Sequence, residues 1–417
     1  MLDYLYYHNN NPSVYNNEIF HEQGNIVEFS KIDLQKKTPI HFFIGRIDYQ
    51  FVKSPSFTFE AGVKAVASNF NNNVSVQRMI NDEWTVDADF TSSSELTETL
   101  GAIYFSFNWL PAKRWQLNSG LRYEYTDTNG ATPEQKLFNR SYGYFFPSLS
   151  LKMVVRNEED LHISYARRIT RPTYNDIASY ASFWGANTFT AENIALMPAI
   201  SDAVRIGYHK KMWVIGLQYN HVSNEILTLQ PEVDGNSNIL TYRSQNLKYV
   251  NTVGLTNSYA VNATPWWEIQ GSLTLQYQVA ETSHLQRNLT FELFGLNVNV
   301  VNILKLPKDF SIEVSAIYQS RSASGISQYL PSGSLNAGIQ KGIGRNATIK
   351  LAMDDILYTN YWRLKTYSPE NMLDTNFQYN WHNQFVRLTY TQKLGNSRLR
   401  SVRLKSGSDE ERKRAGT

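Results

Sequence analysis

The sequence predicts an all-β protein, a transmembrane antiparallel up-and-down β-barrel of which about 16 strands are present. No stretch approaches the roughly 18 consecutive apolar residues that a membrane-spanning helix needs. Apolar and polar residues alternate with period two along many segments, which indicates strands whose two faces meet different surroundings. Tight turns alternate along the chain with long polar connections, an arrangement typical of strands that cross a bilayer and return.

The composition of the 417 residues fits a membrane barrel better than an ordinary soluble domain. Aromatic residues make up 13% of the chain and charged residues 18%, whereas a soluble domain carries about 25% charged residues. Cysteine is absent, which excludes a disulfide framework, a thiolate metal site and a cysteine nucleophile. The net charge of +3 arises from a basic segment at residues 396–417, so the rest of the chain is close to neutral.

The strand predicted over residues 114–126 shows the alternation most clearly. One face carries Trp115, Leu117, Ser119, Leu121, Tyr123 and Tyr125, and the other carries Gln116, Asn118, Gly120, Arg122, Glu124 and Thr126. A charge that faces lipid costs roughly 2–4 kcal/mol at the middle of the bilayer. We therefore expect the first face to contact lipid and the second to line a polar lumen. Residues 269–279, 310–318 and 347–353 follow the same pattern.

Fifteen spanning strands follow from this pattern. They cover residues 41–52, 56–68, 95–109, 113–126, 142–155, 159–169, 201–208, 212–224, 245–262, 266–280, 290–304, 309–320, 332–342, 346–356 and 382–394. Because bacterial single-chain barrels have even strand numbers, the weaker segment 25–34 is the expected sixteenth strand. Residues 83–91 also alternate, but they lie between a rising and a descending strand, so we assign them to an outer loop.

The connections between these strands divide into two classes. Tight turns fall near Pro111, Asn157, Lys210, Pro265, Pro307 and Gly344, and long polar connections fall at residues 127–141, 170–200, 229–242, 280–289, 321–331 and 365–379. Trp109, Trp115, Trp213, Trp266 and Trp267 flank the tight turns, which predicts an aromatic girdle at one membrane interface. A soluble propeller is disfavoured, because no Trp-Asp or Kelch-like signature repeats at a period of about 40–45 residues.

Three phrases of the sequence carry a resemblance to a known family. They are Gly120-Leu121-Arg122-Tyr123-Glu124, Phe145-Phe146-Pro147-Ser148-Leu149 and Ser164-Tyr165-Ala166-Arg167-Arg168-Ile169-Thr170-Arg171-Pro172. Together they resemble the outer-membrane β-barrel family of Bacteroidetes that belongs with the TonB-dependent receptors. The resemblance extends from about Phe57 to Arg403 and includes a last strand that closes with Leu394-Gly395-Asn396.

The resemblance implies energy-coupled uptake of a large nutrient across the outer membrane of a Gram-negative, Bacteroidetes-like bacterium. It also implies a barrel of about 22 strands that is filled by a plug domain, and a short motif that engages TonB. This sequence departs from that pattern, since it shows no signal peptide, no TonB-contacting motif and no plug of the usual size. Residues 192–198 also stand where the family tends to have a Gly-Asn-Pro phrase.

We therefore divide the chain into two parts. Residues 1–394 are expected to form the barrel domain, incomplete at its N-terminus and without the plug, and residues 395–417 a charged periplasmic tail. The chain is interpreted as the C-terminal part of a longer receptor, a truncated gene, or a reduced plugless barrel, and we favour the first two explanations over the third.

Residues for ligand binding are not fixed by the sequence, but four candidates stand out. Arg167, Arg168, Arg171 and Trp184 lie in or beside the outer connection at residues 170–200. Arginines bind anionic groups, and aromatic rings stack on sugar or chelate rings. The simpler interpretation, which we favour, is that the arginines pair with lumen acids such as Glu124 while the aromatic side chains pack the loop.

Catalytic and metal chemistry find little support in the sequence. The eight histidines are scattered without a His-Glu-x-x-His pair, and no Gly-x-Ser-x-Gly elbow occurs, so we expect no metal, no cofactor and no enzyme activity. The acidic pair Asp354 and Asp355 is better explained by a lumen face and a strand end. The basic tail lacks interleaved aromatics and is broken by Asp409, Glu410 and Glu411, so we expect no nucleic-acid partner.

The function predicted from the sequence is that of the translocation and outer-binding part of a receptor-type transporter. Its expected partners are outer-membrane lipid, a nutrient of unknown identity and, through a plug outside this chain, TonB. The main alternative is a plugless porin-like or structural barrel, and a third class is an outer-membrane hydrolase. The substrate, the specificity residues and the oligomeric state do not follow from the sequence.

Overall fold

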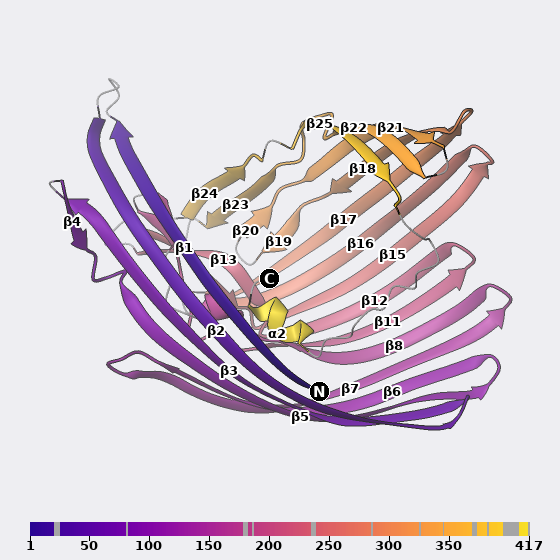
Figure 1. Cartoon of the computed structure of the whole chain (residues 1–417), viewed down its shortest axis with the longest axis horizontal. Coiled ribbons are helices and arrows are strands. Elements are labelled where there is room, and N and C mark those ends of the chain that lie inside the picture. The colour runs from indigo at the N-terminus through magenta and orange to yellow at the C-terminus, as the bar shows by residue number, and fades with distance from the viewer. Residues whose placement is uncertain are drawn as a thin grey trace.

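The computed structural model describes residues 1–417 apart from 21–25, 81, 178–181, 186, 235–238, 285–286, 325–326, 345, 369–372, 382, 395–407 and 416–417. The described residues form one large antiparallel sheet, two small four-stranded sheets and two short helices. The large sheet is strongly curved into a deep trough, and the C-terminal helix lies inside it (Figure 1).

Sixteen strands of the large sheet pair in the order in which they occur along the chain. They are β1 (Leu2–Phe20), β2 (Ile26–Ser54), β3 (Phe57–Ile80), β5 (Ser92–Ala112), β6 (Trp115–Ala131), β7 (Lys136–Arg156), β8 (Glu159–Thr170), β11 (Ala199–Lys210), β12 (Trp213–Ser223), β15 (Tyr249–Thr264), β16 (Trp267–His284), β17 (Arg287–Leu306), β18 (Phe310–Gln319), β21 (Ser332–Ile343), β22 (Ala347–Asp354) and β25 (Phe385–Gln392). Every pairing among them is antiparallel. Between described residues no ladder joins β1 to β25, so the sheet has two free edges.

The up-and-down antiparallel architecture predicted from the sequence is confirmed, and each of the fifteen predicted spans overlaps one strand of the large sheet. The predicted sixteenth strand at residues 25–34 is wrong, because most of that segment is the outer part of β2. The true sixteenth strand is β1, which pairs with β2 from Leu2↔Gly45 to Phe20↔Ile26. Its many asparagines interrupt the alternation of apolar and polar residues, so the sequence pattern did not indicate a strand. The hydrogen bonds of the ladder to β2 keep it extended.

The convex face of the sheet carries continuous rows of apolar side chains. One row runs across five strands through Ile47, Val63, Ile103, Tyr123 and Phe145, which lie directly opposite one another in the ladders. Ile103 is 59% exposed and Phe145 58%. Side chains this apolar and this exposed need an apolar solvent, so the outward face assigned to the strand at residues 114–126 is the lipid-facing one.

The second half of the sheet repeats this arrangement. A row passes through Tyr165, Val204, Tyr219, Val253, Tyr277 and Phe294 on six consecutive strands. The register is therefore set so that apolar residues from neighbouring strands meet on one face, as expected where a slip of one residue would turn every side chain to the wrong side.

All the tight turns predicted from the sequence lie at one end of the sheet. They join strand pairs such as β5 to β6, β11 to β12 and β15 to β16. Several turns contain residues in the left-handed region, among them Glu158 (φ 58°), Lys211 (φ 53°) and Gly344 (φ 60°), as two-residue hairpin loops require. Trp109, Trp115, Trp213 and Trp266 are between 40% and 52% exposed beside these turns, which agrees with the predicted girdle.

The opposite end carries the long connections, most of which contain strands of their own. They contain two four-stranded sheets, one of β13 (Ile226–Asp234), β14 (Ile239–Asn246), β10 (Thr188–Ala191) and β9 (Ser182–Gly185), the other of β19 (Ser322–Ser324), β20 (Ser327–Tyr329), β23 (Trp362–Ser368) and β24 (Leu373–Tyr379). The connections predicted at residues 127–141 and 280–289 are mainly hairpin extensions of β6–β7 and β16–β17. β4 (Glu83–Val86) pairs with the outer end of β3 within the predicted outer loop.

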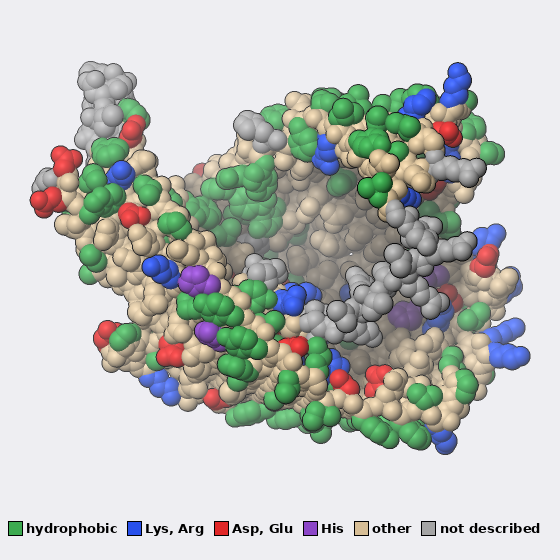
Figure 2. All heavy atoms as spheres, viewed as in Figure 1, with side chains coloured by type: hydrophobic (Ala, Val, Ile, Leu, Met, Phe, Trp, Pro, Cys, Tyr) green, Lys and Arg blue, Asp and Glu red, His purple; other side chains and the backbone are tan. Residues whose placement is uncertain are grey.

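Two short helices lie on the concave side of the sheet, α1 (Tyr174–Ile177) and α2 (Asp409–Arg414). Neither described helix is long and apolar enough to cross a membrane. The main apolar cluster lies between the wall and these segments and includes Phe42, Phe70, Leu100, Tyr174 and Leu196. The inner side of the first strands is thus filled, while a hollow opens over the later strands (Figure 2).

Candidate functional site

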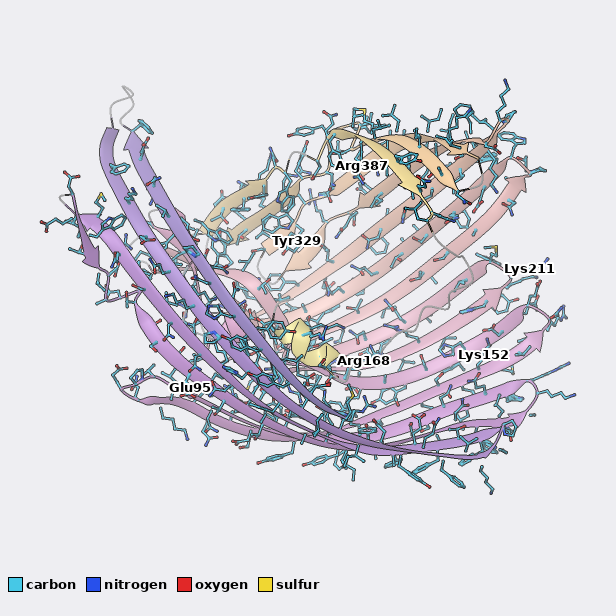
Figure 3. The ribbon with its side chains drawn as sticks, viewed as in Figure 1. Glu95, Lys152, Arg168, Lys211, Tyr329 and Arg387 are labelled. Atoms are coloured by element: carbon cyan, nitrogen blue, oxygen red, sulfur yellow. The ribbon has the colours of Figure 1, made fainter. Side chains whose placement is uncertain are left out.

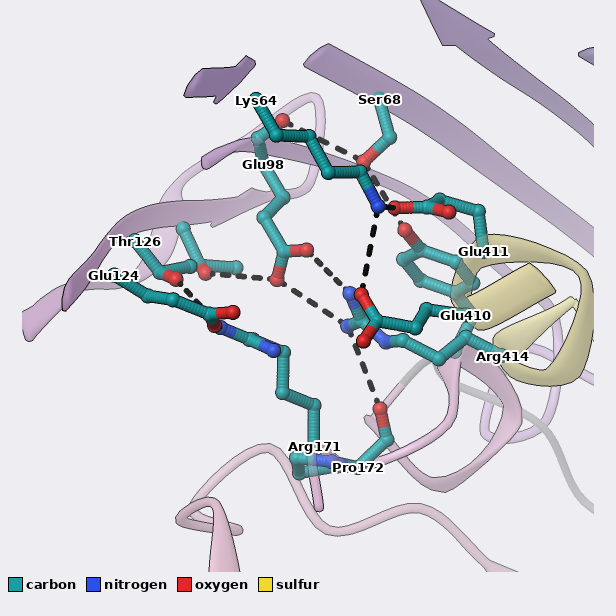
Figure 4. A network of polar contacts seen from close by, with 12 residues as sticks. Lys64, Ser68, Glu98, Glu124, Thr126, Arg171, Pro172, Glu410, Glu411 and Arg414 are labelled. Atoms are coloured by element: carbon teal, nitrogen blue, oxygen red, sulfur yellow. Dashed lines mark hydrogen bonds and ion pairs between the residues drawn. The ribbon is translucent and has the colours of Figure 1, made fainter. Parts of the chain in front are cut away.

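The most densely connected polar site lies on the concave wall of β3, β5 and β6. Alternation turns Lys64, Glu98, Glu124 and Thr126 to this face, and all four are buried. The ladder register brings them together, since Glu98 is opposite Thr128 of β6 and Glu124 is opposite Ala102 of β5. We call the set Lys64, Glu98, Glu124 and Arg171 the wall site (Figure 4).

Arg171 joins the wall site from the other direction. It follows the last residue of β8, where Pro172 turns the chain into the trough. Its Nη2 lies 2.6 Å from Glu124 Oε2 and donates to Thr126 Oγ1 at 3.1 Å. Arg122 also pairs with Glu124. Burial by itself lowers the pKa of Arg171, but Tyr142 and Glu124 outweigh it and hold that pKa above its usual value.

The C-terminal helix α2 completes the wall site with two further charges. Lys64 Nζ lies 2.8 Å from Glu411 Oε1, and both side chains are less than 10% exposed. Arg414 forms a two-pronged pair with Glu98, in which the Nη2–Oε2 distance is 3.2 Å. Burial opposes the charge of Arg414, but Tyr174 and Glu98 together raise its pKa. Arg171 and Arg414 therefore both stay charged and paired.

This position differs from the solvated end that the sequence suggested for the basic tail. Among the described residues of the tail, Ser408 and Glu411 are buried, and Ala415 packs against the main apolar cluster. Residues 395–407 lie outside the described part. The physical reason is charge complementarity. On one face of α2, Glu411 meets Lys64 of the wall and Arg414 meets Glu98.

Tyr174 of α1 links the wall site to the apolar cluster. Its ring stacks on Phe70 with centroids 5.1 Å apart, and its hydroxyl lies 3.0 Å from Ser68 Oγ. The guanidinium carbon of Arg414 lies 4.7 Å from the centre of the same ring. Burial raises the pKa of Tyr174, so the phenol stays neutral and the ring acts as a cation–π partner.

The structure separates the three candidate arginines. Arg171 pairs with Glu124, as the favoured interpretation from sequence expected. Arg167 faces the convex side and forms a bidentate pair with Asp202, at 2.8 and 3.0 Å. Arg168 faces the concave side, where it is exposed (Figure 3), and the described residues give it no ion pair. Only Arg168 is therefore placed to meet a solute in the hollow.

Trp184 belongs to an aromatic chain that ties the outer connections together. Its ring lies 5.0 Å from Tyr242 and 5.2 Å from Phe377, and the contacts continue from Phe377 to Trp362 at 5.2 Å and from Trp362 to Tyr329 at 5.5 Å. Five strands of the two small sheets are joined in this way. Trp184 is 39% exposed, so it combines packing with a free face.

Three neighbouring hollows lie along the concave face of the sheet, and the first of them adjoins the wall site at Lys64. The first, of about 380 Å³, is lined by Arg46, Lys64, Tyr104, Arg122 and Glu410. The second and third, of about 580 and 270 Å³, share Ser164, Ala166 and Arg168. Their walls mix apolar side chains with serines and charged groups. The serines and charged groups offer hydrogen bonds to the polar groups of a solute.

Histidine and acidic side chains are scattered over the described part of the chain. No cluster of three or more His, Asp or Glu residues that could hold a metal occurs there. The acidic pair at the end of β22 has structural roles, since Asp354 pairs with Arg387 at 2.7 Å and Asp355 accepts hydrogen bonds from the backbone N–H groups of Thr359 and Asn360.

Sequence reasoning missed Lys64, Glu98, Glu411 and Arg414 as partners. The sequence indicated only one part of this site. Glu411 and Arg414 are three residues apart, so they lie on the same face if the segment is helical. Nothing in the sequence shows which wall residues they meet, because those lie more than 300 positions away.

The comparisons with known proteins agree with this architecture. The family model for the outer membrane protein beta-barrel family matches residues 1–391. No curated protein matches the chain in a sequence comparison.

Solved structures with a similar fold are larger than this chain. A copper transporter, OprC, has a TM-score of 0.62 at 11% identity, with 94% of this chain and 62% of that one covered. The pyoverdine outer membrane receptor FpvA from Pseudomonas aeruginosa has a TM-score of 0.57 at 11% identity, covering 94% and 58%. The ferric yersiniabactin uptake receptor FyuA from Yersinia pestis has a TM-score of 0.56 at 10% identity, covering 88% and 57%. At such identities the likeness shows the fold, and the chain spans less than two thirds of each of these structures.

Proposed function

Because this chain belongs to the outer membrane protein beta-barrel family, we propose that it is the translocation and outer-binding part of a TonB-dependent receptor that imports a large nutrient. The observation that carries this proposal is the division of the molecule into a lipid-facing convex side and a concave side with charged and serine-lined hollows, with long ordered loops at one end only. A receptor of this kind captures its ligand at the loops and passes it along the polar wall.

We further propose that the chain is the C-terminal portion of a larger barrel whose plug and TonB-contacting motif lie outside it. The free edges of β1 and β25 support this, since unpaired backbone groups are costly in lipid and a spanning sheet must close. The solved relatives, of which this chain covers 57–62%, support it as well. The source would be a Gram-negative, Bacteroidetes-like bacterium. The division into a barrel up to residue 394 and a charged tail from 395, which enters the trough from the periplasmic side, belongs to the same proposal.

Arg168 and Trp184 are the residues that we propose for contact with the ligand. Arg168 lines two hollows of the concave wall, and Trp184 keeps an exposed face within the aromatic chain. Arg167 and Arg171 are engaged with Asp202 and Glu124, so their charges are already compensated. That the chain is not an enzyme stays a prediction.

The second candidate is a plugless porin-like barrel, and the hollow over the later strands favours it. β18, β21 and β22 are described throughout, and none of their residues is buried. Such an uncovered polar wall would let small solutes diffuse through a closed barrel.

Cysteine cross-linking separates the two candidates, because the chain contains no cysteine of its own. Pairs of single cysteines would be placed along β1 and β25 and oxidised in the outer membrane. A fragment of a larger barrel gives no β1–β25 cross-link and no steady conductance in a lipid bilayer. Efficient cross-linking together with a stable open conductance would establish the porin-like barrel and overturn the receptor proposal.

A further inference from the structure

Residues 408–415, which we call the C-terminal latch, lie inside the trough rather than beside it (Figure 1). They make four polar contacts with the wall and the segment after β8: Lys64 to Glu411 at 2.8 Å, Lys64 to Glu410 at 3.4 Å, Arg414 to Glu98, and Arg414 to the carbonyl oxygen of Pro172 at 3.4 Å. We propose that Lys64, Glu98 and Tyr174 form a docking site for a short helix with an acid and an arginine three residues apart, and that the latch occupies it to narrow the lumen.

Charge order is the first argument for a dedicated site. Along the wall, positive and negative charges alternate: Lys64, Glu98, Arg171 and Glu124. Arg171 and Glu124 pair with each other, which leaves Lys64 and Glu98 to be paired by other groups. The described residues offer Lys64 no acidic partner other than Glu410 and Glu411. The latch supplies an acid to Lys64 and a cation to Glu98, so the charges of the wall and of the helix neutralise each other.

Packing is the second argument. Glu411 is 6% exposed and Ser408 1%, and Ala415 reaches the cluster of Phe42, Phe70 and Tyr174. On the same helix Arg412 and Lys413 are exposed. One side of the helix therefore faces the wall: Glu411 and Arg414, three residues apart, contact it, and Lys413 is exposed on the other side.

The latch also borders the passage. Glu410 lines the first hollow together with Lys64, Arg46 and Arg122. Removal of the latch would join this hollow to the space that the helix fills and would expose Lys64 and Glu98 to solute. The consequence for passage rests on the proposed transport function, whereas docking of the latch does not.

Docking is tested by the reactivity of single cysteines in the full chain, folded in detergent micelles. Ala415→Cys lies against the apolar cluster and Lys413→Cys lies on the exposed face of the same helix, which makes the second a matched control. We expect a bulky maleimide to modify Ala415→Cys about tenfold more slowly than Lys413→Cys, because labelling must wait for local opening. Equal rates in the otherwise unchanged chain would overturn the docking proposal.

Two further changes test which wall groups hold the latch. Arg414→Ala and, separately, Glu98→Gln are expected to bring the labelling rate of Ala415→Cys close to that of the control. Arg414→Ala leaves every strand untouched, so loss of protection in this variant cannot come from a misfolded sheet. Persistence of protection in both variants would show that the ion pair does not hold the latch, and would overturn the assignment of the site.

Narrowing is tested by the reactivity of single cysteines on the wall, in the full chain folded in detergent micelles, because this readout does not need a closed barrel. Ser106→Cys lies in the first hollow with Glu410, and Ser201→Cys, the control, lies in the third hollow. Deletion of residues 408–415 is expected to raise the rate at which a bulky maleimide modifies Ser106→Cys about severalfold and to leave the rate for Ser201→Cys unchanged. An unchanged rate for Ser106→Cys would refute the narrowing role, while protection of Ala415→Cys would still support docking.

Discussion

The two halves of the sheet present the same outside and very different insides. In β3, every second residue from Lys64 to Val76 is buried on the concave face, under α1, α2 and the outer connections. In β18, β21 and β22 no residue is buried at all. Both halves nevertheless carry matching apolar rows on the convex face. The lipid side is therefore fixed strand by strand, while the filling of the lumen depends on which connections fold into it.

The largest expected difference between the halves concerns buried apolar side chains. Phe42→Ala removes a ring that is 1% exposed and should lower the free energy of unfolding by about 3–5 kcal/mol. Ile317→Ala, at a concave position that is 50% exposed, should change it by no more than about 0.5 kcal/mol. Urea titration of the protein in lipid vesicles measures both. Equal costs would mean that the two inner faces are filled alike.

The loss of an ion pair should also cost more in the first half of the sheet, where the pair is buried, than in the second half, where it is exposed. Arg171→Ala leaves Glu124 buried with Arg122 as its remaining cation, so we expect a loss near the lower end of the range for broken buried pairs, about 3 kcal/mol. Arg387→Ala removes a partner of Asp354 that is 58% exposed, and should cost about 1 kcal/mol or less. The same titration applies. Insensitivity to Arg171→Ala would show that Glu124 reaches water.

The convex faces should respond alike in both halves. Ile103→Arg in the first half and Leu255→Arg in the second should each cost roughly 2–4 kcal/mol, because both place a charge in lipid. Thr256→Arg, on the concave face next to Leu255, is the control and should fold normally. A tolerated arginine at position 255 would contradict the assignment of the lipid side in the second half. The readout is the yield of folded protein in vesicles as urea is removed.

The smallest effect is expected at Glu225, in the connection after β12. Burial raises the pKa of Glu225 above its usual value, so the folded protein holds this proton more tightly than the unfolded chain. The group thus favours the folded form at low pH, and this contribution is lost as the pH rises through the raised pKa.

The measurement for Glu225 is local. Glu225→Gln should slow proteolysis of the connection at residues 224–249 by about twofold at neutral pH and reduce its dependence on pH. Glu232→Gln, at a position that is paired with Arg243, serves as the control. Faster cleavage of Glu225→Gln at neutral pH would mean that the carboxylate is stabilising.

The sequence predicted the second half of the sheet better than the first, for a reason visible in the side chains. In β16 the concave residues are Gln270, Ser272, Thr274 and Gln276, so polar and apolar residues alternate cleanly. In β2 the concave face carries Ile40, Phe42 and Ile44, and the convex face carries Phe43 as well. Alternation is weak where both faces are apolar, and this is why the start of β2 was misplaced, whereas β1 was missed because of its many asparagines.

The candidate site shows the same limit. Arg171 was expected to meet a lumen acid such as Glu124 because the two residue types suit each other, and the structure confirms that pair. The pairing of Arg167 with Asp202 follows from the register of β8 and β11, which fixes both on the convex face. Glu98 and Arg414 meet across 316 positions of the chain, and no local pattern specifies such a contact.

By itself the sequence determined which face of each well-patterned strand meets lipid and where the chain makes its tight turns. Both are local properties, since a strand alternates with a period of two and a tight hairpin needs only a few residues. Only the tertiary structure decided what fills the concave side, which arginine faces the hollow, and that the C-terminal helix docks on Lys64 and Glu98. Those outcomes depend on side chains from distant segments, whose charges and apolar surfaces stabilise the protein only when the curved sheet brings them together.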